Sequence, residues 1–186
     1  MLLGLGIIEL GLFLAFGLMR PDMPMAVHQP SFWWKLASFG FIALVSGAVA
    51  IVSLDPVRSP RRGLRWVLML IVLSLVAGWT IDASHGDYGA LLLRLHWRQG
   101  LQCLCMIAAL SVPAVAALGL LMRRGAPTDR GGTALAAGLA AAAWGGFVFV
   151  FACPFDDPFY VIVWYSLGCS AVTLFARFAF LRLTRW

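Results

Sequence analysis

Six stretches of roughly 20 mostly apolar residues follow one another along the 186-residue chain, separated by short polar or Pro/Gly-containing breaks. An α-helix rises about 1.5 Å per residue, so about 20 residues cross the hydrocarbon core of a bilayer. Transmembrane β-strands would instead alternate apolar and polar residues over about 10 positions, and this alternation is absent. Only 12% of the residues are charged, about half the share of a soluble domain. The sequence therefore predicts an all-α, polytopic membrane protein, a bundle of six transmembrane helices.

We expect the spans at about residues 2–19, 31–54, 64–83, 100–122, 132–152 and 158–176. Because the connections are short, the whole chain 1–186 is expected to form a single transmembrane domain. The first span starts directly after Met1, contains Glu9 and lacks both a basic flank and a small-residue cleavage site, so it is not a signal peptide. We interpret it as a helix whose usual cytoplasmic lead-in is missing.

Basic residues concentrate in alternate connections. One side carries ten of them, namely Arg58, Arg61, Arg62, Arg65, Arg123, Arg124, Arg130, Arg177, Arg182 and Arg185. The other side has only Arg20, Lys35, Arg94 and Arg98. The positive-inside rule assigns the richer side to the cytoplasm, so we expect a bacterial inner-membrane protein with both termini inside. The net charge of +6 then reflects topology and contact with anionic lipid, and we expect no direct nucleic-acid contact.

One face of the fifth span consists of small residues. Ala134, Gly138, Ala142 and Gly146 recur every four residues, and small residues at this spacing let helix backbones approach closely. We expect this helix to be the most tightly packed of the bundle, through contacts within the chain or, alternatively, between two copies.

Two of the four cysteines are expected at the same depth of the bundle. Cys103 lies near the outer start of the fourth span and Cys153 at the outer end of the fifth. The bacterial periplasm is oxidising, so the two thiols are candidates for a disulfide if their Cα atoms approach within about 7 Å. Cys105 points about 200° away from Cys103 around the helix, and Cys169 lies within the sixth span; both are expected in the core. Two buried, inert thiols remain the other interpretation of Cys103 and Cys153.

The charges near these two thiols differ. Cys103 lies at a helix N-terminus with Arg94 and Arg98 nearby, which would lower the pKa of its thiol. The residues after Cys153 include two carboxylates, which would raise the pKa of the second thiol; they are Asp156 and Asp157. This asymmetry predicts Cys103 as the attacking thiol and Cys153 as the resolving one.

A metal site is a second interpretation of the outer face. His96, Cys103, Cys153, Asp156 and His85 are suitable ligands for a thiophilic divalent ion. They lack the tight spacing of known metal motifs, so the identity of any metal stays open. We expect no resident cofactor.

The function classes are narrowed by what the chain lacks. The sequence contains no Walker motif, dinucleotide fingerprint, HExxH or nucleophile elbow, and the spans hold too few charges for an ion relay. An ordinary enzyme or pump is therefore disfavoured. A membrane thiol oxidoreductase coupled to quinone remains an alternative, with Cys105 and Cys169 as a conceivable second pair, and a structural membrane subunit is another.

Five short segments together resemble one known family. They are residues 18–22 (LMRPD), 61–66 (RRGLRW), 123–128 (RRGAPT), 153–158 (CPFDDP) and 163–165 (VWY). Each is modest alone, but jointly, and over essentially the whole chain, they resemble the NrsF family of membrane-bound anti-sigma factors. Members of that family usually carry a basic, polar segment before the first span, and this chain departs from them there.

The resemblance implies a protein that holds an extracytoplasmic-function sigma factor at the inner membrane and releases it under heavy-metal or oxidative stress. Cys103 and Cys153 match the paired periplasmic cysteines of the family and would be the sensor, with His96, Arg98, Asp156 and Asp157 as neighbours. The sigma factor would meet the cytoplasmic arginines, which are Arg58, Arg61, Arg62, Arg65, Arg123, Arg124 and Arg130.

Overall fold

The computed structural model describes residues 19–183 except Pro56, residues 86–90 and Ala126, and, of the first 18 residues, only Ile8, Gly11, Ala15 and Gly17. Within this part of the chain every regular element is helical, as the sequence predicts. The helices are α2 (Met23–Ala26), α3 (Pro30–Val52), α4 (Arg61–His85), α5 (Leu91–Arg94), α6 (Trp97–Arg124), α7 (Arg130–Val150) and α8 (Pro158–Leu183).

Five of these helices, α3, α4, α6, α7 and α8, are long and apolar enough to cross a membrane. They lie where the second to sixth spans were expected, and α4, α6 and α8 extend several residues beyond the expected limits. The expected first span, including Glu9, lies outside the described residues except at four positions and Met19. The first span, and with it the count of six, therefore stays a prediction.

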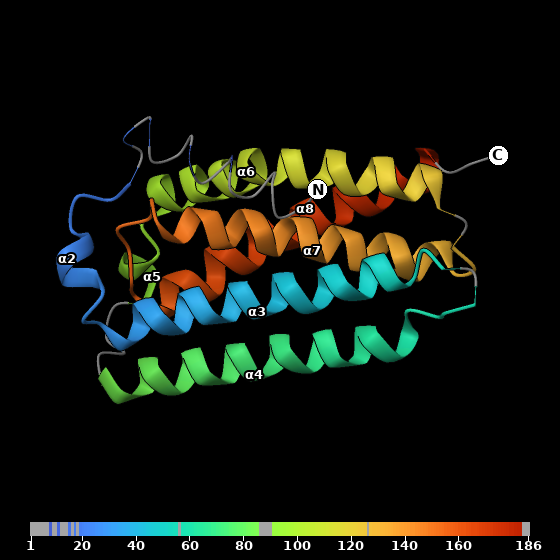
Figure 1. The fold of residues 1–186 in the computed structure, drawn as a ribbon. Coiled ribbons are helices and arrows are strands. Elements are labelled where there is room, and N and C mark those ends of the chain that lie inside the picture. Colours follow the sequence, from blue (N-terminus) through green and yellow to red (C-terminus); the bar gives the residue numbers. More distant parts are fainter. Residues whose placement is uncertain are drawn as a thin grey trace.

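Helix α7 is the centre of the bundle. It packs against α3, α6 and α8, while α4 lies at the edge against α3 and α8 (Figure 1). The small residues of α7 make this possible: a Cβ atom added to Gly138 would lie 2.9 Å from the carbonyl oxygen of Thr173 on α8, and one added to Gly146 would lie 2.9 Å from the Phe39 ring of α3. The face of small residues thus packs within the chain, and the expectation of close packing is confirmed.

The helices run between two chemically different ends of the bundle (Figure 1). One end, here called the cysteine end, contains α2, α5, the start of α6 and residues 151–157 between α7 and α8. The opposite end, here called the arginine end, contains the α3–α4 connection (residues 53–60), the α6–α7 connection (residues 125–129) and the end of α8.

Candidate functional site: a buried cysteine pair and its ion-pair clamp

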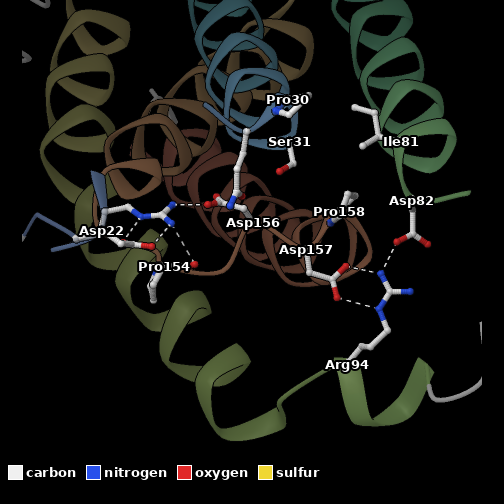
Figure 2. A pocket seen from close by; sticks show the side chains of 12 residues that line it. Asp22, Pro30, Ser31, Ile81, Asp82, Arg94, Pro154, Asp156, Asp157 and Pro158 are labelled. Atoms are coloured by element: carbon white, nitrogen blue, oxygen red, sulfur yellow. Dashed lines mark hydrogen bonds and ion pairs between the residues drawn. The ribbon is translucent and has the colours of Figure 1, made fainter. Parts of the chain in front are cut away.

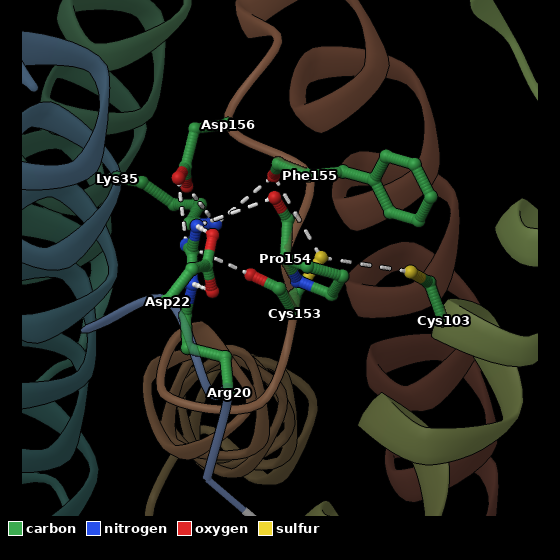
Figure 3. A network of polar contacts seen from close by, with 8 residues as sticks. All are labelled: Arg20, Asp22, Lys35, Cys103, Cys153, Pro154, Phe155 and Asp156. Carbon is green, nitrogen blue, oxygen red and sulfur yellow. Dashed lines mark hydrogen bonds and ion pairs between the residues drawn. The ribbon is translucent and has the colours of Figure 1, made fainter. Parts of the chain in front are cut away.

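Cys103 and Cys153 face each other inside the cysteine end. Cys103 lies on the second turn of α6, and Cys153 follows the end of α7 by three residues. Their Sγ atoms are 3.9 Å apart, both residues are buried, and both are free thiols (Figure 3). The structure therefore brings together the two cysteines that sequence spacing selected.

Helix α8 supports the Cys103 side of the pair. The Tyr160 hydroxyl lies 2.9 Å from the Cys103 Sγ atom, and the Trp164 indole donates a hydrogen bond to the Leu95 carbonyl at 2.7 Å. A Cβ atom on Gly100 would collide with the Trp164 ring, so glycine at this position lets α6 lie close to α8. These contacts fix the position of Cys103 along α8.

Two buried cations hold the Cys153 side. Arg20 donates to the carbonyls of Cys153 (3.0 Å) and Pro154 (3.3 Å), and Lys35 on α3 donates to the carbonyl of Phe155 (3.1 Å). Both cations also pair with Asp156, Arg20 at 2.6 Å and Lys35 at 2.7 Å (Figure 3). We call Arg20, Lys35 and Asp156 the clamp. Because its cations donate hydrogen bonds to three successive carbonyls, residues 153–156 are tied to α3 and to the segment that precedes α2.

A second ion-pair group holds the next residue of the same connection. Arg94 on α5 donates to Asp157 at 2.9 Å and also pairs with Asp82 at the end of α4. The two groups border a cavity of about 610 Å³ between α3, α4, α5 and the α7–α8 connection (Figure 2). The adjacent carboxylates Asp156 and Asp157 thus join four separate segments of the chain at one end of the bundle.

The charge arrangement lowers the pKa of Cys153 to about 6. The largest cause is the hydrogen bond with the Cys103 thiol, and the positive charge of Lys35 adds to it; together they outweigh the opposing effect of burial. The prediction that Asp156 and Asp157 would raise this pKa was wrong, because the Cys103 hydrogen bond and the Lys35 charge set its direction and Asp156 is itself paired with Arg20 and Lys35. Cys153 is therefore the thiol of this pair that is set up to ionise near neutral pH.

The other predicted neighbours of the pair take different positions. Arg98 is exposed, and His96 is exposed with its ring against that of Phe155, 5.6 Å between centroids. Among the described residues, no group of three His, Cys, Asp or Glu side chains is arranged to hold a metal ion. The structure instead brings together the sulfur atoms of Cys103 and Cys153.

The remaining two cysteines lie apart from the pair. Cys105 is exposed, so the expectation that it belongs to the core was wrong; being two residues from Cys103, it points to the opposite side of α6. Cys169 is half-buried, and its thiol donates to the Ala142 carbonyl at 3.5 Å. In the described part of the chain these two do not form a second pair.

Sequence reasoning counted Lys35 and Arg20 as weak topology signals and missed their place beside the pair. Lys35 is 0% exposed although it lies in an apolar helix, and an ionisable residue inside a span is a functional-site signal by default. It is also the only lysine in the chain, where all other basic side chains apart from histidine are arginine. These two facts were available from the sequence.

The arginine end presents a basic surface. All seven predicted partner-binding residues are exposed there, namely Arg58, Arg61, Arg62, Arg65, Arg123, Arg124 and Arg130. Asp129 caps α7 by accepting a hydrogen bond from the Gly132 amide at 2.9 Å and pairs with Arg61 at 3.4 Å, which together lower the pKa of its carboxyl. The start of α4 and the α6–α7 connection are thereby linked to each other.

Comparison with known proteins shows which family the chain is similar to. The family model described as negative regulator of sigma F (NrsF) matches residues 1–186. The anti-sigma-F factor NrsF of Caulobacter vibrioides is 34% identical over 185 residues, which cover 97% of this chain and 85% of that protein. The probable anti-sigma-F factor NrsF of Azospira oryzae is 29% identical over 163 residues, 84% of this chain and 73% of that protein.

These relatives are regulators rather than enzymes by their names. No solved structure matches the chain. The resemblance found in the short sequence segments therefore extends over the full length, and the chain belongs to the NrsF family of negative regulators of sigma F.

Proposed function

We propose that this protein is a membrane-bound anti-sigma factor that holds an extracytoplasmic-function sigma factor at its arginine end and releases it when Cys103 and Cys153 are oxidised. In this proposal six spans cross a bacterial inner membrane, residues 2–19 forming the first. Both termini and the arginine end face the cytoplasm, as the positive-inside rule favours. The cysteine end faces the oxidising periplasm.

The observation that carries the proposal is the 3.9 Å separation of the two buried Sγ atoms. A disulfide has an S–S length of about 2.05 Å, so the atoms need to approach by roughly 2 Å. Two thiols then lose two protons and two electrons to the oxidant as the S–S bond forms. Closure also removes the hydrogen of the Cys103 thiol, so that Cys103 can no longer donate a hydrogen bond across its 2.9 Å contact with Tyr160. Oxidation therefore changes how α6 lies against the α7–α8 connection and α8.

The connection between α6 and α7 supports the route from sensor to partner. Cys103 lies near the start of α6 and Cys153 just after the end of α7, and the two helices are joined at the arginine end by residues 125–129. A displacement at the cysteine end acts on both helices and so on the arginines that flank their connection. A typical coupling of about 1–3 kcal/mol changes partner affinity about 5- to 150-fold.

The exposed arginines suit a partner with an acidic surface. Opposite charges across an interface speed association and fix its orientation, and their effect weakens as salt is added. Contact of the same arginines with anionic lipid is the competing role. We expect binding of the sigma factor to fall steeply as ionic strength rises, and this result would support the protein-binding role.

A reporter gene driven by the sigma factor tests the proposal in cells. We expect the thiol oxidant diamide to switch on the reporter in the wild type and not in Cys103→Ser or Cys153→Ser. Cys105→Ser is the matched control, because it removes an exposed thiol outside the pair, and it should respond like the wild type. A full response in both pair variants would contradict the proposal.

Heavy-metal stress is the other trigger that the family resemblance implies. The same strains treated with a cadmium salt separate the two triggers. A response to cadmium that needs both cysteines, without a response to diamide, would replace oxidation by metal capture.

A further inference from the structure

We propose that Lys35 and Arg20 are positioning residues of the cysteine pair: they hold the backbone beside Cys153, and Lys35 stabilises its thiolate, so that disulfide formation removes a negative charge from beside the buried Lys35 ammonium group. The inference rests on the proposed role of the pair. It explains how oxidation of two sulfur atoms can loosen contacts that hold α3 and the α7–α8 connection together.

Arg20 and Lys35 hold the backbone around Cys153 in place. Their side chains donate hydrogen bonds to the carbonyls of residues 153, 154 and 155. The Arg20 backbone amide is itself tied to the Phe151 carbonyl at 2.9 Å. Cys153 is thus held by contacts on both sides of its own position, and it meets Cys103 only while these contacts persist.

The Lys35 ammonium group also lies close to the Cys153 thiol. Lys35 Nζ lies 3.1 Å and Cys153 Sγ lies 3.7 Å from the same oxygen atom, the Phe155 carbonyl, so the two are at most about 6.8 Å apart. Lys35 Nζ also lies 5.7 Å from the ring centroid of Tyr165, which is itself fully buried. The ammonium group and the thiol therefore share one buried environment.

Lys35 has two negative neighbours when Cys153 is ionised. They are the thiolate and Asp156, which Lys35 shares with Arg20; Arg20 has a second carboxylate partner, Asp22, at 2.7 Å. The other titratable groups nearby are neutral or paired with one another, namely Cys103 on α6, Tyr160 and Tyr165 on α8, and Arg94 with Asp157 and Asp82.

Oxidation removes one of these two neighbours. When the Cys153 thiolate and the Cys103 thiol form a disulfide, two electrons and one proton pass to the oxidant or solvent, and the sulfur of Cys153 becomes neutral. Lys35 then keeps only Asp156, which it shares with Arg20, and a buried charge is less favourable when its pairing is weakened. We expect the clamp to open and Lys35 to become accessible.

The wild-type protein allows a direct test, because Lys35 is the only lysine and is fully buried in the thiol form. The purified full-length protein in detergent is labelled with an amine-acetylating reagent, and the Lys35 peptide is quantified by mass spectrometry before and after diamide. We expect labelling to be at least about fivefold faster in the oxidised protein, the lower end of a typical coupling. Equal rates in both forms would overturn the proposal.

The second test measures how alkylation of Cys153 by N-ethylmaleimide depends on pH, again by mass spectrometry of its peptide. A charge within 6.8 Å shifts a pKa by about 2 units at an effective dielectric constant near 20. We expect Lys35→Met to raise the alkylation midpoint by about 1–2 units and Lys35→Arg to restore it. The midpoint is the readout, because a thiolate of higher pKa is also a stronger nucleophile and the rate alone is ambiguous.

Arg94→Met is the matched control for the second test. Arg94 holds the same connection through Asp157 but contacts none of the three carbonyls that the clamp grips. In Arg94→Met the pH midpoint of Cys153 alkylation should stay close to that of the wild type. An unshifted midpoint in Lys35→Met, or an equal shift in Arg94→Met, would contradict the proposal. Both tests are done without the sigma factor, so their failure is distinct from failure of the proposed partner release.

Discussion

Replacing Asp156 by asparagine should destabilise the protein strongly, although it changes a single atom type. The Asp156 carboxylate lies 2.6 Å from Arg20 and 2.7 Å from Lys35, and the side chains of these two cations are 2% and 0% exposed. Asparagine keeps the shape but removes the negative charge, leaving two buried cations with Asp22 as their nearest carboxylate. Removing one partner of a buried ion pair typically costs about 3–5 kcal/mol, and we expect a loss in that range.

Unfolding of the reduced protein by sodium dodecyl sulfate in mixed micelles, followed by circular dichroism, measures this loss. The matched control is Arg61→Gln, which removes an ion pair whose arginine side chain is 82% exposed; exposed pairs contribute about 0.2–1 kcal/mol. If Asp156→Asn lowered the unfolding free energy no more than Arg61→Gln, the claim that the clamp is a buried structural element would be refuted.

Three further changes test other parts of the structure. Gly138→Leu should destabilise the bundle by more than about 1 kcal/mol, measured by the same unfolding assay, because a Cβ atom there already lies 2.9 Å from the Thr173 carbonyl oxygen. Asp129→Ala should cost about 0.5–2 kcal/mol through loss of the α7 cap, and Asp129→Ser, which can still cap, should recover most of it. The unfolding free energy of the reduced protein should rise from about pH 6 to pH 9, because the pKa of Cys153 is lowered from 9.0 to about 6 and the unfolded chain therefore binds more protons in this range; the rise should vanish in Cys153→Ser.

The helices of the described chain could be predicted from the sequence because each is a long apolar run of its own. The placement of Cys103 and Cys153 at one end of the bundle followed from the same runs, since Cys103 lies near the start of one run and Cys153 just after the end of the next. Their 3.9 Å separation did not follow, because it depends on the close approach of α6 to α8 at Gly100.

The assignment of the reactive thiol failed for a related reason. Asp156 and Asp157 are adjacent to Cys153 in sequence, and their local charge predicts a raised pKa. The cations that reverse this prediction, Arg20 and Lys35, precede Asp156 by more than 120 residues and reach it only in the folded bundle. A local reading of charge is therefore unreliable for a buried site, where charges act through contacts made by distant parts of the chain.

We propose that the redox state of the cysteine pair controls the affinity for the sigma factor. The decisive measurement is the dissociation constant of the sigma factor for the purified protein in detergent, in the reduced form and after diamide. We expect binding about 5- to 150-fold weaker in the oxidised wild type and the same affinity under both conditions in Cys153→Ser. An affinity that stays constant when the wild-type disulfide has formed would contradict it.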